Sequence, residues 1–301
     1  MTGQASSSVG AARAAASASA GRVKARRHFN WRRFGTNVIA VVFSIVWFFP
    51  VYWMTITAFK PRNEVMTTKP AFIPTHWSLE NFHSAIFQSG HFFTNLKNSV
   101  IVTFVAVIVS VVLAFLACAA LTLYRFRGRR TIMVMILAMQ MIPGTAMLIP
   151  QFIVFNQFGL LNKYSGLILA YIALVLPFSI WNMRGFFLAV PTSIFESARV
   201  EGASEWQILR KITFPLVAPG VVSTSVFAFI TAWNDYLTAY TFMKDDTKYT
   251  LPVWLASFTT PAGTDFGGQM AASVIFSLPV VIFFMLVQKN IAKGITTGSV
   301  K

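Results

Sequence analysis

The residues that enzymes use for catalysis are few and scattered in this chain. Its 301 residues include nine acidic residues, four histidines and one cysteine. No paired carboxylates, nucleophile motif or metal-ligand spacing appears within its long apolar stretches. His76, His83 and His91 fall in one stretch, but no Cys or carboxylate cluster accompanies them, so we interpret them as surface histidines. Cys118 has no partner in the chain, and we expect no disulfide, metal, cofactor or enzymatic activity.

The most strongly patterned polar stretch is residues 191–216. Ser193 with Glu196, and Ser204 with Gln207, both have the spacing of a capping box, which marks the start of a helix. Gly202 lies between them, where a chain that turns sharply benefits from a residue without a Cβ. The stretch therefore predicts two short helices joined at Gly202.

The predicted faces of these two helices combine large and small apolar side chains. Phe195 and Ala198 stand three residues apart in the first helix, and Trp206 begins a similar face in the second. A large aromatic side chain near small alanines favours docking into a groove on another protein. An amphipathic segment that lies on the membrane surface is the alternative that these residues leave open.

The positions of these residues depend on helices that cross a membrane. The chain is 55% hydrophobic and 11% charged, with a mean hydropathy of +0.62, which is too apolar for a soluble domain of this size. Six stretches reach the ~20 apolar residues that a bilayer core requires. They are residues 37–59, 96–123, 131–150, 165–184, 220–243 and 269–288. We predict an all-α membrane protein with six transmembrane helices.

The basic residues indicate the direction of these spans. Most of the 25 Lys and Arg residues fall in stretches that are cytoplasmic if both termini lie inside, so the positive-inside rule favours an N-in, C-in arrangement. The formal charge of +16 then needs no partner beyond anionic lipid headgroups. Because the basic clusters do not interleave with aromatic residues that could stack on bases, we expect no nucleic acid.

Residues 1–36 form a separate region that is rich in Ala and Ser and ends in a basic cluster. A polar leader of this length before a span-length apolar run does not match a secretory signal. We interpret it as a disordered basic cytoplasmic tail, either bound to anionic lipid or simply solvated, and its composition favours the second. Residues 37–301 would then form the transmembrane domain, with residues 191–216 as a cytoplasmic loop.

Residues 196–215 resemble the EAA loop of the permeases of binding-protein-dependent ABC importers. That pattern is Glu-Ala-Ala, two residues, Asp-Gly-Ala and, further on, Ile-x-Leu-Pro. This sequence matches it at Glu196, Ala198, Gly202, Ala203, Ile212 and Pro215, and departs from it at Ser197, Glu201 and Phe214. Further stretches resemble the carbohydrate-uptake (maltose-type) class: residues 124–130, 140–144, 184–187, 233–236 and 288–301. The resemblance covers residues 37–301.

The resemblance implies a type I ABC importer permease whose loop is the coupling helix, seated in a cleft of an ATPase subunit. Glu196 would cap or pair at that cleft, Ala198 and Ala203 would allow close packing, and Gly202 would permit the bend. The implied coupling set is Glu196, Ala198, Glu201, Gly202, Ala203, Trp206 and Pro215. The implied partners are cytoplasmic ATP-binding subunits, a second homologous permease, an extracytoplasmic sugar-binding protein and membrane lipid.

One acidic residue, Asp235, falls within a predicted span and is expected to face the bundle interior or a watery path. Trp233, Asn234, Asp235 and Tyr236 would on one interpretation line a pathway, with aromatic rings that stack on sugar. On the other, Asn234 and Asp235 form a hydrogen-bonded pair that holds two helices together, and we favour this one slightly.

The sequence therefore predicts a cell-membrane subunit that forms half of the pathway of an ATP-driven importer for a sugar or oligosaccharide. No glycine-rich phosphate loop with Lys-Ser or Lys-Thr occurs, so ATP hydrolysis would reside in a separate subunit. The alternative is an ion-coupled secondary transporter. Such proteins usually carry chains of intramembrane ionisable groups and paired repeats, which we do not find in this sequence.

Overall fold

The computed structural model describes residues 31–69, 71–88 and 90–298. The chain divides into two units, residues 1–50 and 51–301. The elements, in order, are α2 (Trp31–Ala58), α3 (Arg62–Val65), α4 (Glu80–His83), η1 (Ser84–Gln88), α5 (Phe92–Leu123), α6 (Arg129–Met141), α7 (Gly144–Gln157), α8 (Tyr164–Leu188), α9 (Thr192–Val200), α10 (Glu205–Gln207), η2 (Ile208–Thr213), α11 (Phe214–Trp233), α12 (Leu237–Phe242), η3 (Asp246–Lys248), α13 (Leu251–Ala256), β1 (Thr259–Thr260), β2 (Gly263–Thr264) and α14 (Phe266–Gly298). Residues 1–30 of the predicted disordered leader lie outside the described residues, while residues 31–36, also predicted to be disordered, belong to α2.

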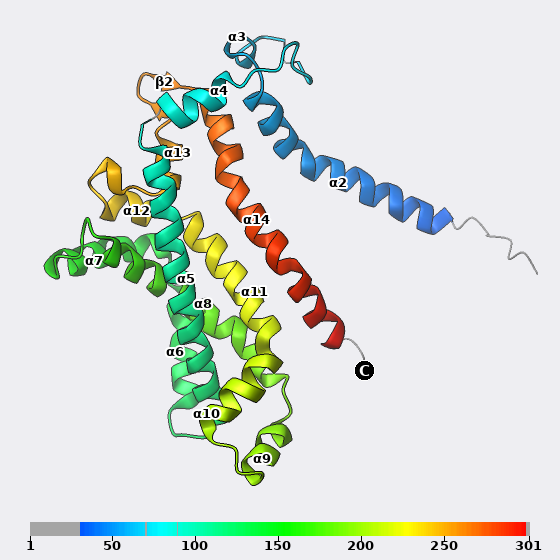
Figure 1. Ribbon diagram of the computed structural model, residues 1–301, viewed down its shortest axis with the longest axis vertical. Helices are drawn as coiled ribbons and strands as arrows, with labels where there is room; N and C mark the ends of the chain where they lie inside the picture. The colour runs from blue at the N-terminus through cyan, green and yellow to red at the C-terminus, as the bar shows by residue number, and fades with distance from the viewer. Residues whose placement is uncertain (1–30, 70, 89, 299–301) are drawn as a thin grey trace, which may run out of the picture. The chain divides into compact units, whose positions relative to one another are not determined.

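Helices α5, α8 and α11 pack against one another at the centre of the second unit (Figure 1). On α5, a stripe at four-residue spacing is fully buried and made of small side chains: Ala106, Ser110, Ala114 and Cys118. Small residues at helix contacts let the backbones approach closely, which drives association in a membrane. At the end of the stripe, the Cys118 thiol donates a hydrogen bond to the Ile180 carbonyl of α8 at 3.0 Å.

Among the described residues, five helical stretches are long and apolar enough to cross a membrane, or six if α6 and α7 count as one bent span. The predicted third span, residues 131–150, is not a straight helix. Its two parts meet at an angle of 101°. Pro143 stands at the junction, and the residue before it, Ile142, has ψ 124°, as expected where the proline ring disfavours a helical neighbour.

The predicted fifth span, residues 220–243, also differs from the structure. Its helix continues from the coupling stretch and ends at Trp233, after which the short helix α12 begins at Leu237. The segment η2, which directly precedes α11, is a π-helix. Pro215 has no N–H to donate to the carbonyl four residues earlier, so an α-helical ladder could not run unbroken through this point.

At the end of the second unit opposite α9 and α10 lie α3, α4 and the β1–β2 hairpin (Figure 1). The hairpin pairs antiparallel, with Thr259 opposite Thr264. Asn81 of α4 is fully buried and donates to the carbonyls of Ala58 and Lys60. Because these carbonyls lie at and just beyond the end of α2, Asn81 fastens α4 to the point where that helix stops.

Candidate coupling segment and pathway pocket

The predicted turn at Gly202 is present. Gly202 has φ +82°, a left-handed conformation that glycine adopts without a steric penalty. Its amide donates to the Arg199 carbonyl at 3.0 Å, and the Ala203 amide donates to the Ala198 carbonyl at 3.0 Å. These two bonds make a Schellman motif, which satisfies the last carbonyls of α9 and turns the chain toward α10.

Of the two predicted capping boxes, the structure contains the second. The Ser204 side chain accepts from the Gln207 amide at 3.3 Å, and the Gln207 side chain accepts from the Ser204 amide at 2.8 Å. The first prediction is wrong: with Ser193 as N-cap the helix would begin at Ile194, but α9 begins two residues earlier, at Thr192, and its N-cap is Pro191. Pro191 has ψ 132°, outside the helical range, and Ser193 falls inside the first turn of α9.

The two faces of the segment differ. Phe195, Ala198 and Ile208 are buried together in a small apolar cluster of their own, and Ala203 is half-buried against it. Ala198 therefore lets α9 pack closely on η2 within this chain, and its side chain is not on the outer surface. The exposed members of the predicted coupling set are Glu196, Glu201, Gly202, Trp206 and Pro215. Trp206 is 64% exposed, although an indole of this size usually gains by burial.

An ion pair that the sequence analysis missed bridges the turn. Arg199 Nε lies 2.9 Å from Glu205 Oε1, so the pair joins the end of α9 to the start of α10. The Tyr124 hydroxyl, just beyond α5, donates to Glu205 Oε2 at 2.7 Å. The carboxylate accepts this bond and holds the pKa of Tyr124 above its ordinary value. The coupling segment is thereby tied to the end of α5.

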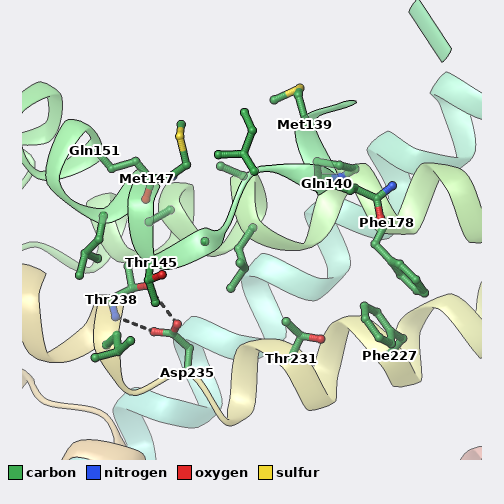
Figure 2. A pocket seen from close by; sticks show the side chains of 18 residues that line it. Met139, Gln140, Thr145, Met147, Gln151, Phe178, Phe227, Thr231, Asp235 and Thr238 are labelled. Carbon is green, nitrogen blue, oxygen red and sulfur yellow. Dashed lines mark hydrogen bonds between the residues drawn. The ribbon is translucent and has the colours of Figure 1, made fainter. Parts of the chain in front are cut away.

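The pathway candidate is a cavity of about 590 Å³ between the bent α6–α7 pair and helices α8, α11 and α12 (Figure 2). Its polar lining comes from several elements: Gln140, Thr145, Gln151, Thr231, Asp235 and Thr238. Phe178 and Phe227 also line it and stack with ring centroids 3.6 Å apart. The α6–α7 bend thus presents polar side chains from both of its arms to the same cavity.

Asp235 is fixed where α11 stops and α12 starts. Its Oδ1 accepts from the amides of Thr238 at 3.1 Å and Ala239 at 3.2 Å, and its Oδ2 accepts from the Thr238 hydroxyl at 3.0 Å (Figure 2). A carboxylate at the first turn satisfies amides that have no helical partner. The same carboxylate lines the cavity, so Asp235 has the lining position of the first interpretation, while its structural role is to cap α12 and not the predicted pairing with Asn234.

The three neighbours of Asp235 lie elsewhere. Trp233 is buried, and its Nε1 donates to the Phe276 carbonyl of α14 at 3.2 Å. The Asn234 side chain donates to the Ile230 carbonyl of the preceding helix α11 at 2.7 Å. The predicted hydrogen-bonded pair of Asn234 with Asp235 is therefore not what the structure shows. The Tyr236 ring stacks on Tyr240 at 5.4 Å, beside a separate cavity of about 330 Å³. Of the four predicted pathway residues, Asp235 alone lines the cavity in Figure 2.

Comparison with known proteins decides the family. Residues 106–297 match the family described as "Binding-protein-dependent transport system inner membrane component". The chain belongs to this family. Membership confirms the resemblance inferred from the EAA-like loop, and it confirms the predicted inner-membrane location. The chain is accordingly a transport component and not an enzyme.

Individual relatives are similar over most of their length. The chain is 42% identical over 265 residues to the diacetylchitobiose uptake system permease protein DasC of Streptomyces coelicolor, covering 88% of this chain and 96% of that one. It is 33% identical to the trehalose/maltose transport system permease protein MalG of Thermococcus litoralis, over 87% and 94% of the two chains. It is 31% identical to the trehalose transport system permease protein SugB of Mycobacterium tuberculosis, over 92% and 99%.

A solved structure shares the fold. A chain of a bacterial ABC transporter involved in the import of the acidic polysaccharide alginate matches with a TM-score of 0.75 at 23% identity, over 87% of this chain and 98% of that one. The match confirms the predicted ABC importer permease fold. Nothing in the comparisons supports the ion-coupled secondary transporter.

Proposed function

We propose that this chain forms half of the translocation pathway of an ATP-driven importer for a sugar or oligosaccharide, and that ATP is hydrolysed by a separate subunit. Family membership and relatives named for diacetylchitobiose, trehalose and maltose uptake support the substrate class. The working partners would be two cytoplasmic ATPase subunits, a second homologous permease and an external sugar-binding protein. Residues 37–301 would form the permease domain, with a basic cytoplasmic leader at 1–36.

The observation that carries this proposal is the outward face of the coupling segment. Trp206 stands 64% exposed beside a turn that two backbone hydrogen bonds and the Arg199–Glu205 pair hold in place. The backbone that carries Trp206 is therefore held in place before any partner arrives. Exposed aromatic side chains are frequent anchors of protein interfaces, and Trp206 would enter the cleft of the ATPase subunit.

A continuous helical path would carry the motion of the ATPase into the membrane. Residues 205–233 form one span-length stretch through α10, η2 and α11. At 1.5 Å per residue it is about 40 Å long. Ile208 at one end belongs to the buried cluster of the coupling segment, while Phe227 and Thr231 near the other line the pathway cavity. A push on α9 and α10 would therefore move the cavity wall directly.

The pathway cavity is a further argument for a second permease as a partner. It is bounded on one side by α7, which has no buried residue although its sequence is strongly apolar. In a membrane such a surface contacts lipid or protein, and Gln151 and Thr145 on it are costly to expose to lipid. A homologous permease packed on α7 would close the cavity and shield these polar groups.

The test is Trp206→Ala in the complete transporter, with Trp77→Ala as the matched control. The two indoles are 64% and 66% exposed, but Trp77 lies on the predicted external side. Loss of an interface anchor typically costs about 2 kcal/mol or more, which is roughly 30-fold in affinity. We expect Trp206→Ala to lose the ATPase subunit on purification from detergent while Trp77→Ala retains it. Equal recovery of the ATPase with both variants would contradict the proposed docking site.

A further inference from the structure

A second polar cavity lies at the predicted cytoplasmic end of the bundle, among the ends of α5 and α8, the start of α6 and helix α9. Its volume is about 490 Å³. Four arginines from three segments line it: Arg125, Arg129, Arg184 and Arg199. Glu196 is the single acidic residue in its lining. Because like charges that share a cavity repel one another, this arrangement favours an anion between them.

Two of these arginines already have partners. Arg199 pairs with Glu205, and Arg129 Nη1 donates to the Tyr124 carbonyl at 3.3 Å. Arg125 and Arg184 form no ion pair within the part of the chain that the structure describes. The Arg184 side chain is attached at a half-buried position near the end of α8, where its charge is partly removed from water.

The cavity has a further unmet polar group. The hydroxyl of Thr122, the second-last residue of α5, is buried and has no hydrogen-bond partner in the described part of the chain. Thr122 also lines this cavity. Buried hydroxyls are normally paired, so a ligand that accepts hydrogen bonds would satisfy it together with the guanidinium groups.

Guanidinium groups match the oxygens of phosphate with paired, charge-assisted hydrogen bonds. The cavity stands where α5 and α8, both span-length, reach the cytoplasmic membrane surface, and there the anionic phosphates of the inner leaflet lie. We propose that this cavity binds the headgroup of an anionic phospholipid. The bound phosphate holds α9 against the ends of α5 and α8, because Arg199 belongs to the coupling segment and Arg125 and Arg184 do not.

This inference rests on the membrane placement of the proposed function but not on its substrate, so we test it by binding and not by transport. The assembled transporter is titrated with phosphatidylglycerol in detergent and bound lipid is counted by native mass spectrometry. Phosphatidylcholine is the neutral comparison. Inorganic phosphate is the soluble competitor. The variant Arg125→Gln/Arg184→Gln is compared with Arg127→Gln/Arg130→Gln, which removes the same charge from the same end without touching the cavity lining.

We expect the wild type and the control to retain phosphatidylglycerol over phosphatidylcholine, and the cavity variant to bind it about tenfold more weakly, as the loss of a charge-assisted hydrogen bond predicts. Equal weakening in both double variants would overturn the site in favour of a diffuse surface charge. Displacement of the lipid by millimolar phosphate would assign the cavity to a soluble anion. If the wild type binds lipid only after the ATPase subunits are stripped away, a carboxylate of the ATPase is the occupant and the proposal fails. Arg184→Lys keeps the positive charge and controls for loss of lipid through misfolding. It should retain more lipid than Arg184→Gln.

Discussion

Replacing Gly202 by alanine isolates the contribution of the turn between α9 and α10. An added Cβ would meet no atom within 4 Å, so the substitution creates no clash. The cost comes from the backbone alone, because an L-residue at φ +82° loses roughly 1–2 kcal/mol relative to glycine. A gain of up to about 1 kcal/mol from a less flexible unfolded chain offsets part of this. The net cost of about 1 kcal/mol lowers the population of the bent turn about fivefold relative to opened conformations.

The assay is ATP-dependent uptake by the complete transporter, with membrane insertion measured on the same cells by immunoblot. Gly159→Ala is the matched control, since Gly159 has φ +61° and equally open space but lies after α7, away from the coupling segment. We expect Gly202→Ala to reduce uptake several-fold at normal insertion, and Gly159→Ala to leave it near the wild-type rate. Gly202→Pro should abolish uptake, because proline cannot reach this φ and removes the amide bond to the Arg199 carbonyl. Normal uptake by Gly202→Pro would refute the mechanical role of the turn.

Three further outcomes follow from the contacts. Asp235→Asn keeps an acceptor for Thr238 and so keeps the α12 cap, but it removes the negative charge from the cavity. We therefore expect this variant to show reduced uptake and unchanged thermal stability. Asp235→Ala should lower both uptake and thermal stability, the stability by about 1 kcal/mol. In a double-mutant cycle of Tyr124→Phe and Glu205→Ala, read as thermal stability, we expect a coupling of about 1 kcal/mol, and additive effects would show that the bond in the structure contributes nothing. The hydrogen bonds that the Asp245 carboxylate accepts from Asn162 and Lys248 lower the pKa of Asp245. The stability that these bonds give the loop is therefore present above the ordinary Asp pKa and is lost as the pH falls through the lowered pKa. We expect amide exchange in this loop to become faster only below the ordinary Asp pKa, and faster exchange already at that pH would contradict the prediction.

The coupling segment was largely predictable because its signals are local. The Ser204–Gln207 box and the glycine turn depend on residues within a few positions of one another, and both are present. The Arg199–Glu205 pair was missed because six residues is not a helical spacing. Tyr124, which completes the network, stands 81 positions before Glu205. Such a contact is set by packing between helices and leaves no mark in the local pattern.

The pathway cavity was the harder part to predict. Residues 131–150 are mostly apolar, and Pro143 in such a stretch suggests a kink, but the direction and the 101° size of the bend depend on what the two arms pack against. In the same way, hydropathy carried the predicted fifth span past Trp233, although Asp235 caps a new helix there. In each case the prediction placed a polar side chain within one continuous helix. In the structure, that side chain lies next to the break between two helices and lines the cavity.

Transport in proteoliposomes tests the central claim most directly. The chain would be reconstituted with the second permease and the ATPase subunits, and uptake of a labelled oligosaccharide would be measured with and without ATP and the external binding protein. We predict uptake that requires both and that stops with Trp206→Ala. Transport by this chain alone, driven by an ion gradient without ATP, would contradict the account.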